Sequence, residues 1–332
     1  MGNTKVRAFA AYSIDEKTRR NSSSGGIFTH LAQQVLNDHG AVYGVSMTED
    51  CKSAYMLRIN SEDELFKLRG SKYLQAKMGD SFQAVKRDLE NHIKVLFSGT
   101  ACQINGLRLF LQNDYDNLYC IDIICHGTPS QKLWKKYVDS IVFGKGAKLQ
   151  EVSFRCKDKG WSNFGMKVRT KNKSFYRSMG DNAYMQMFLS NLSLRPSCYQ
   201  CQAKMTRYSD LTMADFWKID EVAPEMNDNK GISLVIIRSP KGKALFDAIS
   251  AQVRMKEVTY EDGVKGNPSE YSSVKRPDKR NDFYKDAESM SFSALEKKYA
   301  PKSIKQKTKI LIKDILYALN ENRGGGVTDE TQ

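Results

Sequence analysis

The sequence predicts an α/β fold: a mostly parallel or mixed sheet flanked by helices, with an added antiparallel, cysteine-bearing region and a C-terminal helical extension. Strand and helix patterns alternate through the first half of the chain, which favours a mostly parallel sheet covered by helices. From residue 151 the pattern changes to short strands and a closely spaced cysteine pair. Near the C-terminus, apolar residues recur at helical spacing. These changes predict a core at 1–150, an antiparallel and cysteine-pair region at 151–240, and a linker, helix and tail at 241–332.

The core region reads as strands and helices in turn. We expect strands at 6–12, 41–47, 54–59, 95–97 and 118–124. We expect helices at 26–37, 62–68, 82–90, 101–111 and 129–142. The helix at 26–37 carries an apolar stripe and ends before Gly40.

The later regions differ in pattern. Residues 152–155 and 166–169 alternate as antiparallel strands would, and a helix is expected at 181–191 with further strands at 210–213 and 233–238. The segment 263–280 is polar and rich in turn formers, which indicates a linker or long loop. Residues 304–319 form a basic amphipathic pattern that suits peripheral contact with a membrane, a partner, or the protein's own core. The tail after Arg323 is expected to be disordered.

The chain of 332 residues has 40% hydrophobic and 27% charged residues, as is ordinary for a globular protein, but its net charge is +14. Such a charge suits an acidic partner, which could be nucleic acid, an anionic coenzyme, an acidic electron carrier or anionic lipid, or it belongs to a solvated surface. Neither a membrane-spanning run nor a signal-peptide apolar region is present, so we expect a cytoplasmic protein. There the seven cysteines are expected to be metal ligands, catalytic thiols or core residues rather than disulfides.

Two cysteines lie at strand-to-helix turns. Cys102 follows a buried strand, with Thr100 predicted to cap the next helix. Cys125 follows the next strand, where Thr128 is the predicted cap and Pro129 the first helical residue. Both cysteines should therefore lie at the carboxyl ends of parallel strands, where open α/β sheets place their sites. A helix N-terminus also favours the thiolate form of Cys102.

Cys198 and Cys201 form a C-x-x-C pair, a spacing that lets two thiolates reach one metal centre. Four thiolates suit either zinc or a 4Fe–4S cluster, and a simple thiol pair or core cysteines also fit the sequence. The other cysteines differ: Cys120 reads as a buried strand residue, Cys51 lies in a polar turn, and Cys156 lies in a charged segment.

A serine–glycine loop at 21–26 directly precedes a helix. Backbone N–H groups, small side chains and the helix dipole can hold a phosphate or a flavin edge there. The alternative is that a serine simply caps the helix.

Several motifs occur together in one order along the chain. They are the loop 22–26, the segment 70–75, the runs 97–107 and 121–130, Phe154-Arg155 with Trp161, the cysteine pair, and the run 209–217. In this combination the chain resembles the coenzyme F-420 hydrogenase/dehydrogenase beta-subunit family over roughly residues 5 to 240. It departs from the common pattern at Ala101, where many members have Pro, and at Ala214 and Lys218, where many have Gly.

The resemblance implies an oxidoreductase whose core at 1–150 binds FAD. It implies that one 4Fe–4S cluster is held by four cysteines: Cys102, Cys125, Cys198 and Cys201. It implies flavin contacts from two segments: Ser22, Ser23, Ser24, Gly25 and Gly26, and Ser71, Lys72 and Tyr73. His126 could then move a proton at the flavin or hold a neighbouring group by a hydrogen bond.

The resemblance also implies partners. Longer relatives carry their own ferredoxin domain, so electrons here would pass to or from a separate ferredoxin-like carrier or partner redox subunit. The two-electron acceptor would be coenzyme F-420 or another anionic small molecule. Arg155 and Trp161 either line the acceptor side of the site or serve only in packing. Two rival interpretations are a zinc-stabilised binding module without catalysis and a family member that has lost its flavin. Nucleic acid is not an expected partner, because no RNA-binding aromatic signature or C2H2 spacing is present.

Overall fold

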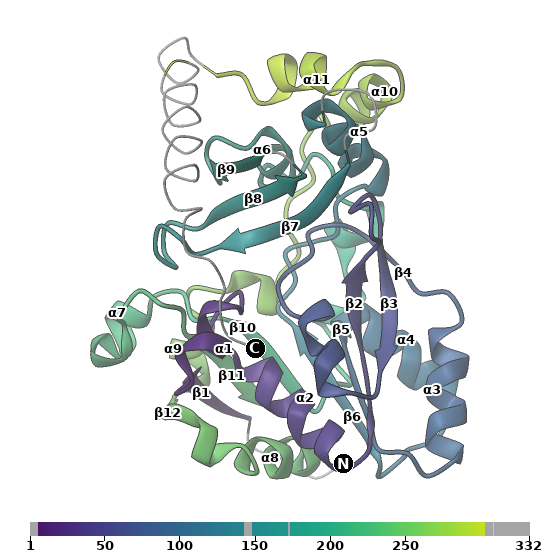
Figure 1. Cartoon of the computed structure of the whole chain (residues 1–332), viewed down its shortest axis with the longest axis vertical. Helices are drawn as coiled ribbons and strands as arrows, with labels where there is room; N and C mark the ends of the chain where they lie inside the picture. Colours follow the sequence, from purple (N-terminus) through teal and green to yellow (C-terminus); the bar gives the residue numbers. More distant parts are fainter. Residues whose placement is uncertain (1–5, 143–147, 172, 303–307, 309–332) are drawn as a thin grey trace.

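The computed structural model describes residues 6–142, 148–171, 173–302 and 308 (Figure 1). Over these residues the chain forms a nine-stranded sheet in the order β12-β1-β11-β10-β6-β5-β2-β3-β4 and a three-stranded sheet in the order β7-β8-β9. The large sheet consists of β1 (Arg7–Ser13), β2 (Ala41–Met47), β3 (Ala54–Ile59), β4 (Ala76–Lys77), β5 (Val95–Thr100), β6 (Leu118–Ile123), β10 (Leu211–Asp215), β11 (Ser233–Ile237) and β12 (Val253–Val258).

The large sheet is mixed, as predicted. Its centre is parallel, because β2 pairs with β5, β5 with β6, and β6 with β10 in the same direction. One edge is antiparallel, since β1 lies between β11 and β12 and β10 pairs with β11. The carboxyl ends of β5, β6 and β10 consequently meet at one rim of the sheet.

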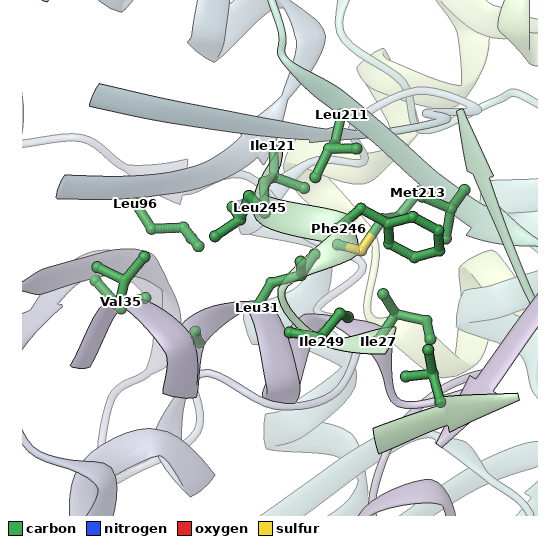
Figure 2. Close-up of a cluster of buried hydrophobic side chains, with 14 of the residues drawn as sticks. Ile27, Leu31, Val35, Leu96, Ile121, Leu211, Met213, Leu245, Phe246 and Ile249 are labelled. Atoms are coloured by element: carbon green, nitrogen blue, oxygen red, sulfur yellow. The ribbon is translucent and has the colours of Figure 1, made fainter. Parts of the chain in front are cut away.

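Helices cover both faces of the large sheet. Helix α2 (Ile27–Asn37) and helix α8 (Pro240–Asp247) pack on the face that carries Leu96 and Ile121, as Figure 2 shows. Helices α3 (Ser81–Glu90) and α4 (Ala101–Leu111) cover the opposite face of β2, β5 and β6. The short helices α7 (Ile219–Val222) and α9 (Tyr260–Val264) cover that same face nearer β1, and α1 (Glu16–Arg20) follows β1. Because strand side chains alternate, adjacent residues of β5 enter different cores.

The small antiparallel sheet has a core of its own. It contains β7 (Leu149–Cys156), β8 (Gly165–Thr170) and β9 (Ser174–Ser178), with α5 (Gln131–Ile141), α6 (Ala183–Leu189), α10 (Arg280–Ser289) and α11 (Phe292–Tyr299) packed around it. Its centre is aromatic, with Trp134 fully buried against Phe154 and Tyr184. Short 3-10 turns complete the described chain: η1 (Glu62–Lys67), η2 (Pro196–Gln200), η3 (Gln202–Lys204), η4 (Pro224–Met226), η5 (Ser250–Gln252) and η6 (Pro268–Glu270).

Helix α5 begins later than predicted. Its cap is Ser130, whose side chain accepts from the Leu133 N–H, and not Thr128. The reason is tertiary: Pro129 forms an isolated bridge with Leu194, and the Ser130 N–H donates to the Ser193 carbonyl at 2.9 Å. These contacts hold the chain extended for the residues that would otherwise start the helix.

Three strands from outside the expected core region belong to the large sheet. Strands β10 and β11 come from the expected region 151–240, and β12, from the expected region 241–332, joins β1 at the edge. The expected loop at 263–280 is largely irregular, with only the end of α9, the turn η6 and the start of α10 in it. The predicted basic helix at 304–319 and the tail lie outside the described residues. Within the described part of the chain, every helix is too short or too polar to cross a membrane.

Candidate functional site

A cavity of about 1020 Å³ lies where the rim of the large sheet meets the small sheet. Its walls include the carboxyl ends of β5, β6 and β10, the start of α2, and Arg155 and Tyr176 of the small sheet. The predicted serine loop, the 71–73 segment, Cys102, Cys125 and His126 all contribute to the lining. The geometry therefore brings segments that are distant in the sequence to one place.

Two glycines fix the serine loop against the sheet. The Gly25 N–H donates to Ser233 Oγ at 3.0 Å, and the Gly25 carbonyl accepts from the Ser13 N–H at 2.7 Å. A Cβ atom at Gly25 would lie 2.4 Å from the Ala11 carbonyl oxygen, so only glycine fits. Gly26 has a φ of +89°, in the left-handed region that glycine adopts without strain.

The N-terminus of α2 carries no side-chain cap, because its cap residue is Gly26. The alternative in which a serine caps this helix is therefore wrong. Ser22 and Ser24 instead donate to the carbonyls of Thr18 and Ile232, both at 2.7 Å. The first residues of α2 line the cavity, so uncapped N–H groups are available there to an anion.

The two predicted flavin segments contact each other directly. Ser23 Oγ accepts from the Ser71 N–H at 2.8 Å and lies 3.0 Å from Ser71 Oγ. Lys72 Nζ donates to three carbonyls at the end of η1, and burial lowers its pKa to about 7. The Tyr73 ring packs edge-on against Phe154 at 5.8 Å. These contacts make the 71–73 segment a fixed wall of the cavity.

The four predicted ligand cysteines come from three parts of the fold. Cys102 is exposed in the first turn of α4, where its Sγ lies 3.1 Å from Thr100 Oγ1. Cys125 follows β6, and Cys198 lies in η2 with Cys201 directly after it. The Thr128 N–H donates to Cys198 Sγ at 3.3 Å, which joins the chain after β6 to the cysteine pair.

The electrostatics of these thiols link them to one another. Burial, with smaller contributions from the nearby thiols of Cys102 and Cys198, raises the pKa of Cys125 to about 12. Burial likewise raises the pKa of Cys198, with added contributions from Cys102 and Cys201. The positive charge of Lys204 acts in the opposite direction on the Cys125 pKa. Thiols that act on one another in this way would repel as bare thiolates, so a cationic centre suits them.

The spacing of the thiols bears on which centre they fit. Among the described residues, no three His, Cys, Asp or Glu side chains gather closely enough to hold a single metal ion. Tetrahedral zinc with bonds of about 2.3 Å needs its four sulfurs nearly in contact. A 4Fe–4S cluster is bound by one thiolate at each of several irons and tolerates wider spacing. A set of four thiolates is chemically able to hold either a 4Fe–4S cluster or zinc.

His126 lies beside Cys125 and lines the cavity. Its Nε2 is 2.7 Å from Asn191 Oδ1, its ring meets Phe188 edge-on at 5.2 Å, and burial lowers its pKa. The contact with Asn191 fixes the ring, and both roles expected of His126 beside the flavin stay predictions.

Some site residues were not singled out by sequence reasoning. Asp215, at the end of β10, accepts from Arg155 at 2.8 Å and from Trp161 Nε1 at 2.9 Å. Trp217 stacks on Trp161 with ring centroids 5.1 Å apart and lines the cavity. The only sequence signal for these residues was their place in the run 209–217.

The lining is electropositive. Its basic side chains are Arg69, Lys72, Arg155, Lys159 and Arg195, of which Lys72 is only partly charged near pH 7 because burial lowers its pKa to about 7. Asp215 is the single acid among the described lining residues, and it is paired with Arg155. An anionic ligand therefore suits this cavity.

The departure at Lys218 preserves the backbone. Lys218 has a φ of +70°, so it adopts the left-handed conformation that a glycine would take there. Its side chain pairs with Glu221 at 2.7 Å. A lysine at this position therefore makes the turn less favourable in free energy than a glycine would, while the backbone still adopts the left-handed conformation.

Comparison with known proteins agrees with this architecture. The model of the coenzyme F-420 hydrogenase/dehydrogenase beta subunit N-terminus matches residues 8–82, and the model of the C-terminus of the same subunit matches residues 92–262. No curated protein matches. A chain of the F-420-reducing nickel–iron hydrogenase complex from Methanosarcina barkeri, solved as a xenon derivative, has a similar fold with a TM-score of 0.52 at 15% identity. The match covers 75% of this chain and 81% of that one.

The two family models together span most of both sheets and the cysteine pair. The match of the C-terminal model alone covers more than half of the chain. The chain belongs to the coenzyme F-420 hydrogenase/dehydrogenase beta subunit family.

Proposed function

We propose that this oxidoreductase chain holds one 4Fe–4S cluster through Cys102, Cys125, Cys198 and Cys201 and binds FAD in the adjacent cavity. The observation that carries the proposal is that Cys102 and Cys125 line the same cavity as the serine loop, while the Thr128 N–H, just after Cys125, donates to Cys198 Sγ at 3.3 Å. The family supports the oxidoreductase role, and the chemistry of the residues supports the choice of cofactors.

The residues of the cavity would hold the flavin by its anionic part. The uncapped N–H groups of α2 and the cations of the lining favour a pyrophosphate, because both carry positive charge toward the cavity. Gly25 and Gly26 let the backbone approach closely, and Ser23 fixes the loop to Ser71. Flavin supplies the exchange between two-electron and one-electron transfer when it is bound.

The proposed partners follow from the same arrangement. Cys102 is exposed, so the cluster would have an edge toward a ferredoxin-like carrier or a partner redox subunit. The hydrogenase chain with the similar fold belongs to a complex, which favours a partner subunit. The electropositive cavity suits coenzyme F-420 or another anionic two-electron acceptor. We place the protein in the cytoplasm, where cysteines remain reduced.

The test is to purify the protein without oxygen, record its absorption spectrum, and assay iron, acid-labile sulfide, zinc and flavin. We expect iron and sulfide in equal amounts together with flavin. Cys198→Ser and Cys102→Ser should each lose most of the iron, because each replacement removes one of the four thiolates that would hold the cluster.

Cys120→Ala is the matched control. Cys120 lies on β6, the same strand that leads to Cys125, but it is fully buried within the apolar core and away from the cavity lining. This variant should keep its iron. A colourless wild-type protein that contains one zinc and no sulfide would contradict the proposal, and it would favour the zinc-stabilised module. Iron and sulfide without flavin would identify a member that has lost its flavin.

A further inference from the structure

One lysine lies between two of the proposed ligands. Lys204 ends η3, and its backbone N–H donates to the Cys201 carbonyl at 3.2 Å. Its side chain reaches the segment just after β6, where Nζ donates to the Cys125 carbonyl at 2.9 Å. Nζ also donates to the Ser269 carbonyl in η6. The half-buried ammonium is thus held in place beside the thiols of Cys125 and Cys201.

The charge of Lys204 is not neutralised by a close carboxylate. None of the ion pairs formed within 4 Å by the described residues includes it, whereas the neighbouring Arg207 is paired with Asp122 at 2.7 Å and with Glu270 at 3.0 Å. Its hydrogen-bond partners are neutral carbonyls. Glu270 acts on Lys204 from farther away but is itself paired with Arg207 and Arg238, so Lys204 keeps a positive charge that no ion pair among the described residues offsets.

We infer that Lys204 sets the reduction potential of the proposed cluster, raising it through a fixed positive charge. The inference rests on the proposed function. When a reduced ferredoxin-type carrier passes one electron to the cluster, the site gains one negative charge, and a nearby cation stabilises the reduced form more than the oxidised form. Partial burial strengthens this effect, because solvent screens the charge less. Lys204 is a positioning and tuning residue and forms no bond to the iron.

The experiment is a redox titration of the anaerobic holoprotein, followed by electron paramagnetic resonance of the reduced cluster. Lys204→Met removes the charge and keeps the length of the side chain, whereas Lys204→Arg keeps the charge. We expect Lys204→Met to lower the equilibrium constant for reduction about tenfold, equivalent to about 59 mV for one electron. Lys204→Arg should stay close to the wild type.

Lys241→Met is the matched control. Lys241 Nζ also bridges two carbonyls, those of Tyr115 and Leu118, at 2.8 and 3.0 Å. These lie at the opposite end of β6 from Cys125, about 20 Å away at the usual rise of a strand. The control therefore loses a comparable bridge without losing charge near the cluster, and its potential should equal that of the wild type.

The outcomes separate this inference from the proposed function. A wild-type protein without iron and sulfide would refute the proposed function itself. A wild-type cluster whose potential is unchanged in Lys204→Met would refute only the role of Lys204. If Lys204→Met fails to retain a cluster, Lys204→Arg decides: retention at the wild-type potential supports the role of charge, and loss of the cluster there too overturns it in favour of a purely structural bridge.

Discussion

The path of the serine loop depends on single residues. At Gly25 the backbone of the loop lies against β1 and β11 so closely that no Cβ atom fits, and at Gly26 the chain turns through a left-handed conformation into α2. Without these two residues, the loop could not bring the uncapped end of α2 to the cavity wall. The glycines would thus act on the proposed flavin binding through the backbone and not through a side chain.

Gly25→Ala is expected to destabilise the protein by about 1 to 3 kcal/mol and to reduce its flavin content. The new Cβ atom would lie 2.4 Å from the Ala11 carbonyl oxygen and 2.8 Å from the Ser233 nitrogen, both of which are backbone atoms that cannot turn away. Urea denaturation and the flavin-to-protein ratio measure the two effects.

Gly106→Ala is the comparison within α4. A Cβ atom there would meet only the Phe82 ring, at the ordinary distance of 3.5 Å, and alanine is the better helix former. We expect a gain of about 0.5 to 1 kcal/mol in the free energy of unfolding. If Gly25→Ala proved as stable as Gly106→Ala, the close approach of the loop to the sheet would be wrong.

At the scale of elements, two strand-to-helix units carry the proposed ligands Cys102 and Cys125. The two units differ in how their helices begin. Helix α4 starts where local signals place it, with Gln103 Oε1 accepting from the Thr100 N–H at 2.8 Å. Helix α5 starts later because the chain after Cys125 first pairs with the segment before the cysteine pair. That extended stretch places the Thr128 N–H on Cys198 Sγ.

Cap substitutions test this difference. Ser130→Ala should cost about 1 kcal/mol, because Ser130 is the cap of α5 and satisfies the Leu133 N–H. Thr128→Ala should change stability by less than about 0.5 kcal/mol, because the contact from this residue to the cysteine pair comes from its backbone. Equal losses of stability in both variants, or a larger loss in Thr128→Ala, would contradict this start of α5. They would favour the start that the sequence predicts, with Thr128 as the cap.

Much of the fold was predictable, because its signals are local. Helix α2 and strands β2 and β3 lie where periodicity and flanking residues place them. Strand β12 was not predicted, since most of its residues are exposed and give no alternating apolar pattern. Its identity as a strand depends on pairing with β1 at the far end of the chain.

The residues of the site also differ in how far the sequence alone predicts their place. The positions of Cys102 and Cys125 after buried strands were readable from the sequence, because each depends on its own strand and helix. The roles of Asp215 and Lys204 were not, because their partners Arg155 and Cys125 lie 60 and 79 residues away. Such contacts exist only once the two sheets have come together.

At the scale of the whole molecule, a cluster of buried side chains joins the two sheets beside the cavity. Arg155 of β7 is almost fully buried, pairs with Asp215 of β10, and lies over the Phe164 ring at 3.6 Å. Trp161 donates to the same carboxylate and stacks on Trp217. This contact fixes the small sheet, and with it one wall of the cavity, against the large sheet.

Asp215→Asn should therefore destabilise the protein by about 2 to 3 kcal/mol and weaken flavin binding, because it leaves the buried Arg155 without its counter-charge. Glu151→Gln is the control on the same small sheet. Its partner Arg169 is 53% exposed, and we expect a change within about 0.5 kcal/mol. Thermal denaturation and flavin titration check both variants. Similar stability of the two would mean that the sheets are held together elsewhere.

The convergence of the four thiols is the claim on which the proposed electron transfer depends. Its most direct measurement is an anaerobic crystal structure with anomalous diffraction recorded at the iron absorption edge. The arrangement described above predicts one compact iron signal bound by Cys102, Cys125, Cys198 and Cys201, next to the cavity behind the serine loop. An iron-free site, or sulfurs too widely separated to bind one cluster, would contradict it.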